Sequence, residues 1–304
     1  MGVLTDPDRS RRRVAAVGMF DGVHRGHRHL LRQVAATAQA EGLTPAVVTF
    51  MSHPSQRLTP DSPVKNLTDT PTRLSLLQEN GAADIVLLDF CEELRCMNAR
   101  EFLEMLHRDY AIDCLIVGFN NRFGHNRTEG FTDYCRYGRE IGIKVIEATE
   151  APEGKVSSSI IRRLIAAGRV EDAAAELGRP YSIEGTVVGG KRIGRTIGFP
   201  TANIAPASAR SLIPAGGVYA AYVTDVDTAE RHKAMVNIGS RPTVNDDGSD
   251  LTVEAYLLDF NKDIYGHRLK VDFILRLRDE MRFGSLDELS ARLQADEAAT
   301  RRAL

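Results

Sequence analysis

Hydrophobic positions in the first half of the chain form short continuous runs that alternate with amphipathic stretches of helical period. Continuous runs are typical of parallel strands, because helices bury such a sheet on both faces. The predicted strands are Val14–Phe20, Thr44–Phe50, Ala83–Phe90, Ile112–Phe119 and Lys144–Glu150. The predicted helices between them are His27–Glu41, Pro71–Asn80, Ala99–Tyr110 and Asp133–Ile141. This alternation predicts a doubly wound, Rossmann-like α/β domain with a parallel sheet.

Local signals mark several helix ends. Thr70 before Pro71 predicts that Thr70 is the N-cap of the second helix, with proline at the first helical position. Two more helices are expected near Ser157–Ala167 and Val170–Leu177, and each is followed by a glycine that can end it.

The pattern changes after Pro180 to short strand-like stretches separated by glycine, proline and polar clusters. They are Tyr181–Val188, Gly217–Thr224, His232–Ile238, Leu251–Leu258 and Leu269–Leu275. No helical pattern intervenes, which predicts an antiparallel β-barrel. A terminal helix is expected to begin at Ser285, where Ser-Leu-Asp-Glu288 forms a capping box. We therefore expect two domains, residues 1–180 and 181–304.

Charge and composition exclude several classes of protein. The 304 residues carry 39 Lys and Arg against 41 Asp and Glu, a net charge of −2. This balance disfavours a nucleic-acid coat, which needs a basic excess. No apolar run approaches the ~18 residues that span a bilayer. The four cysteines lack C-x-x-C spacing, so we expect reduced thiols in a cytoplasmic protein rather than disulfides or a metal site.

The first candidate site follows the first predicted strand, in the segment Gly18–His27. Ligands of open parallel sheets bind at the carboxyl ends of strands, where helix N-termini offer free N–H donors. His24 and His27 lie three residues apart, so both imidazoles can face one phosphate and stabilise charge during nucleotidyl transfer. The candidate nucleotide-binding residues beside them are Gly18, Phe20, Asp21 and Gly26. The alternatives are a polar turn with incidental histidines or, less favoured, zinc, for which no thiolate or carboxylate has ligand spacing.

A second candidate site lies in the glycine-rich, basic segment Gly189–Asn203. It is not a Walker A loop, because no G-K-[ST] closes it. Thr201 and Asn203 would point the same way on an extended chain, and their oxygens suit Mg²⁺ held mainly by nucleotide phosphates. The candidate phosphate-binding residues are Gly190, Lys191, Gly194 and Arg195. The alternative without a binding function is a hairpin with a mobile basic tip.

Four segments of the first half together resemble a known family. Gly18–His27 is similar to the signature of the H-x-G-H nucleotidyltransferases, and Thr49–Pro54 resembles the T-F-x-x-H-P that follows the second strand. Gly118–Gly124 resembles a G-x-[DN]-F-x-F-G loop, and Val156–Arg162 a helix start of the form I-S-S-T-x-I-R. In this order the segments resemble the bifunctional riboflavin kinase/FAD synthetase family of prokaryotes. Here Asn121 replaces an aromatic residue and Ser159 a threonine.

The resemblance implies that the first half transfers AMP from ATP to FMN and releases pyrophosphate. Among the matching positions, His53, Ser158 and Arg162 are candidates for nucleotide binding, and Asn120 and Phe123 for flavin binding. A guanidinium one turn into a helix can clamp a phosphate. The alternative for Ser158 and Arg162 is a capped surface helix in which Arg162 is solvated. The alternative for His53 is a loop histidine without a function.

The second half resembles the riboflavin kinase part of the same family. Gly194–Asn203 is similar to the signature G-R-x-x-G-F-P-T-A-N. A kinase that phosphorylates an alcohol needs a proton acceptor, and Glu254 matches the position of the family's catalytic glutamate. Arg278 resembles a segment near the isoalloxazine, where an arginine can stack. The alternative for Glu254 is an outward-facing strand residue in ordinary alternation. The alternative for Arg278 is a surface arginine without a role in binding.

The whole pattern predicts a cytoplasmic, Mg²⁺-requiring enzyme that uses ATP to convert riboflavin to FMN and then FMN to FAD. Its expected partners are these substrates, without nucleic acid or membrane. Two other interpretations stay open, namely an enzyme in which only the kinase is active, and a flavin- or nucleotide-binding regulator without catalysis. Accumulation of FMN from riboflavin and ATP would exclude the regulator.

Overall fold

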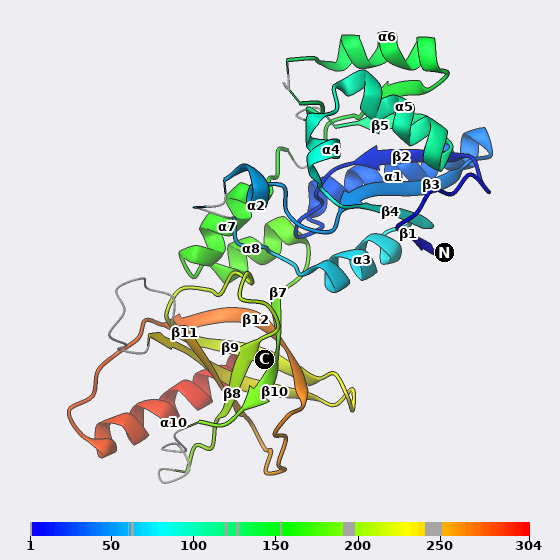
Figure 1. Ribbon diagram of the computed structural model, residues 1–304. Helices are drawn as coiled ribbons and strands as arrows, with labels where there is room; N and C mark the ends of the chain where they lie inside the picture. The colour runs from blue at the N-terminus through cyan, green and yellow to red at the C-terminus, as the bar shows by residue number, and fades with distance from the viewer. Residues whose placement is uncertain are drawn as a thin grey trace. The chain divides into compact units, whose positions relative to one another are not determined.

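The structure is a computed structural model that describes residues 2–59, 61, 64–118, 121–125, 128–152, 154–190, 198–240 and 251–304. By its contacts the chain divides into two units, Met1–Ser157 and Ser158–Leu304. Each unit has its own sheet (Figure 1) and is described by itself.

The first unit is a six-stranded sheet in the order β1-β4-β3-β2-β5-β6, and every neighbouring pair is parallel. Its strands are β1 (Gly2–Leu4), β2 (Arg13–Val17), β3 (Thr44–Phe50), β4 (Asp84–Leu88), β5 (Ile112–Val117) and β6 (Lys144–Glu147). Its helices are α1 (Arg25–Glu41), α2 (Ser55–Leu58), α3 (Thr70–Glu79), α4 (Glu92–Cys96), α5 (Ala99–Tyr110) and α6 (Phe131–Ile141). The chain leaves β2 toward β3 on one side, whereas β5 lies on the other, so β2 and β5 flank the switch point.

Two hydrophobic cores cover the two faces of this sheet. Alternate residues of β2 point to opposite faces. Val14 and Ala16 pack with side chains of α1 and α3, whereas Ala15 and Val17 pack with side chains of α5 and α6. All five residues of β2 are buried, which explains why this strand has a continuous hydrophobic sequence.

The second unit is a closed barrel in the order β10-β11-β8-β7-β12-β9, and every neighbouring pair is antiparallel. Its strands are β7 (Tyr181–Val188), β8 (Ala202–Pro206), β9 (Gly217–Asp225), β10 (Arg231–Ser240), β11 (Leu251–Leu257) and β12 (Arg268–Arg278). Its helices are α7 (Ser158–Ala166), α8 (Val170–Leu177) and α10 (Leu286–Ala303). Helix α10 packs on β9, β10 and β12, on the outside of the barrel (Figure 1).

Helices α7 and α8 belong to the barrel unit by their contacts. Helix α8 packs on β12 and β7, and the backbone N–H of Ala215 donates to the carbonyl of Ile165 in α7 at 3.3 Å. The domain boundary predicted near residue 180 stays a prediction, whereas the contacts divide the chain after Ser157.

The predicted fold class is confirmed, namely a doubly wound parallel sheet followed by an antiparallel barrel and a terminal helix. The predicted N-cap of α3 is wrong. Asp69 is the N-cap, and its carboxylate accepts from the backbone N–H of Thr72 at 2.9 Å. Strands β1 and β8 were not predicted, because they have only 3 and 5 residues.

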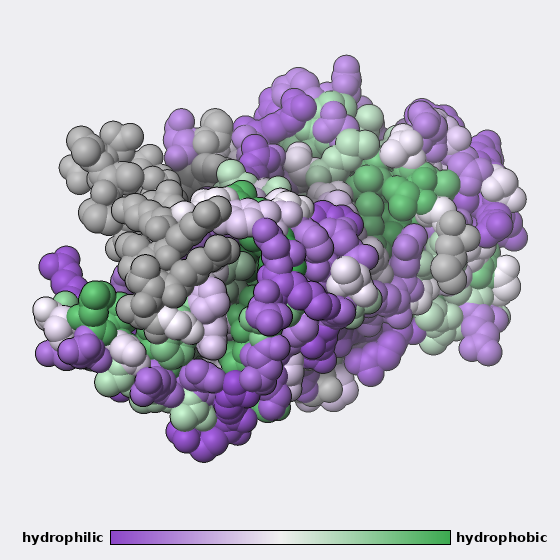
Figure 2. All heavy atoms as spheres, turned by 90° about the horizontal axis from the view of Figure 1, so that it is seen from below, coloured by the Kyte–Doolittle hydropathy of each residue, from purple (hydrophilic) through white to green (hydrophobic). Residues whose placement is uncertain are grey.

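The surface in Figure 2 is largely hydrophilic, and hydrophobic residues reach it in smaller groups. Within the described ranges, none of the helices combines the length and the hydropathy needed to cross a bilayer.

Candidate functional site

His24 and His27 are brought together at the start of α1, directly after the turn that follows β2. His24 is the N-cap, and its Nδ1 accepts from the backbone N–H of His27 at 3.3 Å. The two imidazoles stack with their centroids 3.6 Å apart and their planes 15° apart. The edge of Phe20 contacts His27 at 5.1 Å between centroids. Gly26 keeps this corner open, because a Cβ there would lie 3.3 Å from the ring of His24 and 3.8 Å from the carbonyl of Val156.

The electrostatics of His27 favour a neutral imidazole. Burial lowers its pKa well below the ordinary value of 6.5, and the neighbouring His24 lowers it further. Its Nδ1 is buried and has no hydrogen-bond partner among the described residues. A buried polar atom without a partner is costly unless a ligand satisfies it. His27 is therefore equipped to hydrogen-bond a ligand without carrying a charge.

Asp21 holds a neighbouring loop. Its carboxylate is buried and accepts from the backbone N–H groups of Leu67 and Thr68, at 3.0 Å each. The Thr68 hydroxyl in turn accepts from the N–H of Gly22 at 3.1 Å. Asp21 thus fixes the shape of the turn through contacts that sequence alone did not predict.

The other predicted residues of this site follow the neighbouring strands. Gly18 continues β2 and donates its N–H to the carbonyl of Val48 in β3 at 3.0 Å. His53, just after β3, accepts from the N–H of Ser55 at 3.1 Å through Nδ1. Beyond β5, the ring of Phe123 stacks on Tyr134 with centroids 4.0 Å apart, so it packs against the α5–α6 core. Asn120 lies outside the described residues.

Ser158 and Arg162 lie on the first and second turns of α7, in the barrel unit. Val156, two residues before Ser158, approaches Gly26 within the first unit.

The second site centres on three neighbouring barrel strands. In the strand register Glu254 of β11 pairs with Asn203 of β8 on one side and with Asn237 of β10 on the other. Directly opposite residues have Cβ atoms ~5 Å apart and point to the same face. The buried residues of β11 alternate with Glu254, so Glu254 points away from the barrel interior. The hydroxyl of Thr201 donates to its Oε2 at 3.3 Å.

Two pockets meet at Thr201. The smaller, of about 300 Å³, contains Glu254, Asn237 and Arg278 together with the apolar residues Phe199, Val218, Met235, Tyr256, Leu289 and Leu293. The larger, of about 490 Å³, lies between β7, β8 and the segment 260–265, and Lys262 and Tyr265 contribute to its wall. Thr201 lines both pockets, and Glu254 lies beside it in the smaller one.

Gly190 and Asn203 contact each other closely. A Cβ at Gly190 would lie 2.1 Å from Nδ2 and 3.0 Å from Oδ1 of Asn203, so only glycine leaves room for this amide. Thr201, Asn203 and Glu254 together offer a hydroxyl, an amide and a carboxylate oxygen. Such a set of oxygen donors fits Mg²⁺. Lys191, Gly194 and Arg195 lie outside the described residues.

Arg278 is held on the wall of the smaller pocket by a residue that sequence analysis did not single out. Asp296 of α10 is 2% exposed, and it accepts from Nε and Nη2 of Arg278 at 2.8 and 2.7 Å. The Arg278 guanidinium also lies 5.9 Å from the ring centroid of Phe283. The ion pair fixes the end of β12 to α10 and leaves a planar cation on the pocket wall.

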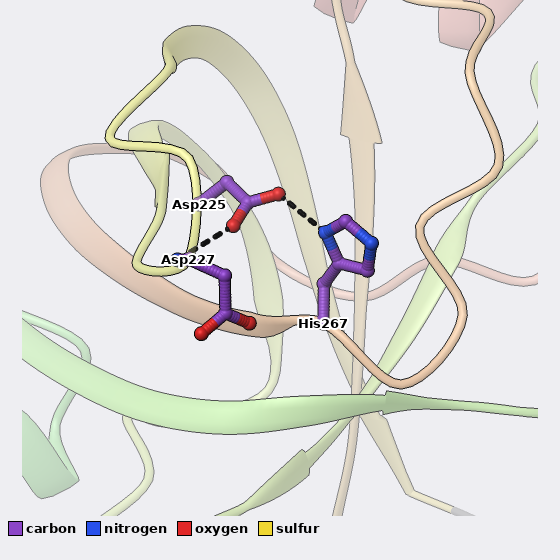
Figure 3. A group of neighbouring side chains, drawn as sticks. All are labelled: Asp225, Asp227 and His267. Carbon is purple, nitrogen blue, oxygen red and sulfur yellow. Dashed lines mark hydrogen bonds and ion pairs between the residues drawn. The ribbon is translucent and has the colours of Figure 1, made fainter.

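A third cluster, Asp225, Asp227 and His267, has the spacing of metal ligands (Figure 3). Its oxygens are already engaged. Asp225 accepts from His267 Nδ1 at 2.7 Å and from the N–H of Asp227 at 2.9 Å, and Asp227 pairs with the Arg268 guanidinium at 3.1 Å. A guanidinium at this distance disfavours a cation, so the cluster is better explained as a structural network.

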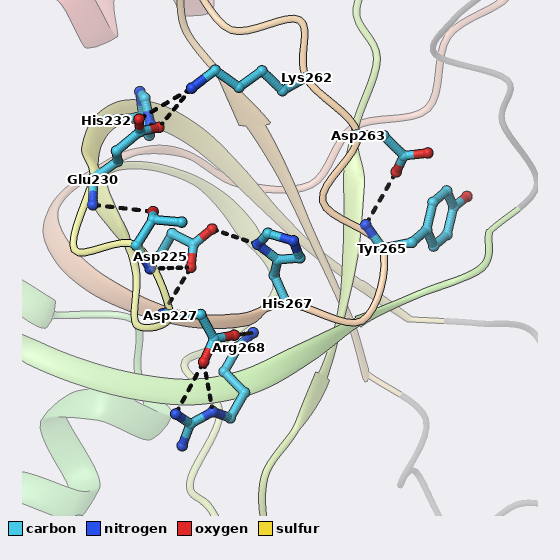
Figure 4. Close-up of polar contacts among 10 residues, drawn as sticks. Asp225, Asp227, Glu230, His232, Lys262, Asp263, Tyr265, His267 and Arg268 are labelled. Atoms are coloured by element: carbon cyan, nitrogen blue, oxygen red, sulfur yellow. Dashed lines mark hydrogen bonds and ion pairs between the residues drawn. The ribbon is translucent and has the colours of Figure 1, made fainter.

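This network fixes the segment that lines the larger pocket (Figure 4). Lys262 pairs with Glu230 at 3.1 Å, and Asp263 accepts from the N–H of Tyr265 at 3.1 Å. The N–H of Gly266 donates to Val187 in β7 at 3.0 Å. The 262–267 segment is thus tied at both ends, to the β9–β10 hairpin and to β7.

We expect His267→Gln to destabilise the protein more at low pH than at high pH. The hydrogen bond to Asp225 raises the pKa of His267 above 6.5. A histidine with a raised pKa stabilises the fold fully below that value and loses the contribution as the pH rises through the folded pKa. Burial alone would raise the pKa of Asp225, but hydrogen bonds from His267 and from the backbone outweigh this effect and lower the pKa below 3.8. Asp225 therefore stays ionised over the pH range in which His267 titrates.

The measurement is the Tm difference between wild type and His267→Gln, between about pH 5.5 and about pH 8.5. In an Asp225→Asn background the same change should no longer depend on pH. A Tm difference that stays constant over this range would contradict the assignment.

Family comparisons cover both units. Residues 6–160 match the FAD synthetase family, and residues 177–304 match the riboflavin kinase family. A crystal structure described as a macrolide-efflux protein from Streptococcus pneumoniae is 32% identical, with a TM-score of 0.88 over 98% of both chains. The likeness of fold therefore extends over nearly the whole chain.

Curated relatives of nearly equal length are similar over almost all of the chain. A bifunctional riboflavin kinase/FMN adenylyltransferase of Listeria monocytogenes is 34% identical over 98% of this chain and 95% of its own. Proteins of the same description from Escherichia coli (strain K12) and Pseudomonas fluorescens are 34% and 35% identical. Each of these two matches covers 95% of this chain, with 91% and 92% of the respective relative.

Proposed function

The chain belongs to the family of bifunctional riboflavin kinase/FMN adenylyltransferases, and we infer from this membership that it converts riboflavin to FMN and FMN to FAD. Both steps consume ATP. The barrel unit phosphorylates riboflavin, and the adenylyl transfer belongs to the half of the chain that matches FAD synthetase. The residues proposed below for each step are the ones whose geometry suits the chemistry.

We assign riboflavin to the smaller barrel pocket and ATP to the larger one. The observation that carries this assignment is Thr201, which lines both pockets and hydrogen-bonds to Glu254. The smaller pocket has aromatic and aliphatic walls that suit a flavin ring, and Arg278 offers a planar cation to stack on it. The larger pocket has the volume for a nucleotide, and Lys262 can pair with phosphates.

In the kinase step Glu254 accepts the proton of the riboflavin 5′-hydroxyl as its oxygen attacks the γ-phosphorus of ATP. The bond between the γ-phosphorus and the oxygen that links it to the β-phosphate breaks, and ADP leaves. Thr201 orients the carboxylate through its hydrogen bond, while Gly190 supplies a closely approaching backbone and Lys191, Gly194 and Arg195 supply phosphate contacts. Thr201 and Asn203 would hold Mg²⁺, which neutralises phosphate charge when bound.

In the adenylyl transfer a phosphate oxygen of FMN attacks the α-phosphorus of ATP, and pyrophosphate leaves. FMN phosphate is already a nucleophile, so the step needs positioning and charge stabilisation rather than a base. His27 donates to the phosphates as a neutral imidazole, and the stacked His24 orients it through the N-cap contact. We further propose nucleotide contacts from Gly18, Phe20, Asp21, Gly26, His53, Ser158 and Arg162, and flavin contacts from Asn120 and Phe123.

Four free cysteines, Cys91, Cys96, Cys114 and Cys135, support the further proposal that the enzyme works in the reducing cytoplasm. The proposed boundary between the two domains lies near residue 180, close to residue 177, where the match to the riboflavin kinase family begins.

The test is a time course with pure protein, riboflavin, ATP and Mg²⁺, followed by chromatography. FMN should appear first and FAD after it, and chelation of Mg²⁺ should stop FMN formation. FMN without FAD, also when FMN is supplied, would leave only the kinase active. Absence of both products would overturn the proposal in favour of a non-catalytic binding protein.

A further inference from the structure

Asn237 occupies a position equivalent to that of Asn203 on the opposite side of Glu254. The register pairs Asn237 with Glu254 across β10 and β11, and Asn203 with Glu254 across β8 and β11. The glutamate is therefore flanked by an amide on each neighbouring strand, on the same face of the barrel. Asn203 lies toward Gly190, whereas Asn237 lines the smaller pocket together with Glu254.

The amide of Asn237 is not engaged by any other residue that the structure describes. Within the described part of the chain its side chain makes no hydrogen bond, although it is only partly exposed. Gly239, two residues further along β10, lies close to this amide and to the Glu280 carboxylate, because a Cβ there would lie 3.4 Å from Nδ2 of Asn237 and 3.0 Å from Oε1 of Glu280. An uncommitted amide on the wall of a largely apolar pocket is typical of a group that orients a ligand.

The chemistry of the Asn237 amide and its position together indicate which part of the substrate it binds. An asparagine amide both donates and accepts, which matches a hydroxyl that also does both. Glu254 takes the terminal hydroxyl of the ribityl chain, so a group one strand away faces the next hydroxyl along that chain. The apolar walls formed by Phe199, Tyr256 and Leu293 suit the flavin ring rather than the ribityl chain.

We propose that Asn237 binds the ribityl 4′-hydroxyl of riboflavin and thereby determines the specificity of the kinase for a polyol chain. This inference rests on the proposed kinase function. Without the 4′-hydroxyl, the amide would be desolvated with no partner, which costs binding free energy in the transition state. The alternative role of Asn237 is to orient the Glu254 carboxylate. Loss of that role would lower the rate equally for every alcohol substrate.

The experiment compares two substrates with wild type and Asn237→Ala. One substrate is riboflavin, and the other is a flavin whose N10 chain is 5-hydroxypentyl, with only the terminal hydroxyl. Wild type should prefer riboflavin in kcat/KM by about 10-fold or more, and Asn237→Ala should remove that preference. The loss should fall on riboflavin, whereas phosphorylation of the hydroxypentyl flavin should change less than about 3-fold. Asn237→Ser, which keeps a hydroxyl, should restore part of the preference.

Activity on the hydroxypentyl flavin reports an intact kinase centre, and adenylylation of supplied FMN reports the other half of the same chain. Equal losses on both flavins would overturn the proposal and assign Asn237 to the orientation of Glu254. An unchanged preference in Asn237→Ala, or a wild type without preference, would also overturn it. A wild type that phosphorylates neither flavin would instead overturn the kinase function, and this inference with it.

Discussion

Glu254→Gln should abolish FMN formation, with kcat for riboflavin reduced by about 10³-fold, while adenylylation of supplied FMN continues at the wild-type rate. Glutamine keeps the shape of the side chain and can still accept from Thr201, but it cannot take the proton of the 5′-hydroxyl. General base catalysis is worth roughly 10²–10⁴-fold. The measurement is the initial rate of each half-reaction with one preparation of the variant.

A matched control is Glu297→Gln, which changes a carboxylate on α10 that pairs with Arg301 on the helix surface. It should leave both rates within about 2-fold, because exposed pairs contribute little. Loss of both activities in Glu254→Gln would mean that Glu254 supports the fold, and an unimpaired kinase would remove it from the reaction.

His27→Ala should lower FAD formation from supplied FMN and ATP by at least ~10-fold, and up to ~10³-fold, without unfolding the protein. The imidazole contributes a hydrogen bond to phosphates in the transition state, and its buried Nδ1 has no partner among the described residues that alanine would leave unsatisfied. Because the pKa of His27 lies well below 6.5, its neutral form should persist between about pH 6.5 and pH 8, and its titration should not change the rate there.

His29→Ala provides the control on the same helix, since its ring hydrogen-bonds to Thr149 at 3.1 Å. It should leave the rate of FAD formation close to wild type. The kinase rate of both variants serves as an internal standard for folded enzyme. Equal losses in His27→Ala and His29→Ala would argue for damage to α1 rather than for a role of His27 in the site.

Local patterns were sufficient for most elements of the fold. The continuous runs of β2 to β5 predicted buried parallel strands, because burial on both faces favours apolar residues at consecutive positions. Ser285 was correctly predicted as the N-cap of α10, where it accepts from the N–H of Glu288. The error at α3 arose because Asp69 and Thr70 are both good caps, and the choice between them depends on backbone geometry that a sequence does not record.

What the sequence determined by itself was a set of candidate reacting groups and the strand or turn on which each one lies. Periodicity of two assigns Glu254 to a face of its strand but does not say which strands flank it. Only the folded barrel places Asn203 and Asn237 on either side of Glu254, and two pockets on either side of Thr201. Tertiary structure likewise directs Asp21 toward Leu67 and Thr68, because residues 46 positions apart meet only through folding. Composition and residue spacing describe neighbouring positions in the sequence, whereas a binding site forms where segments that are distant in the sequence pair with each other.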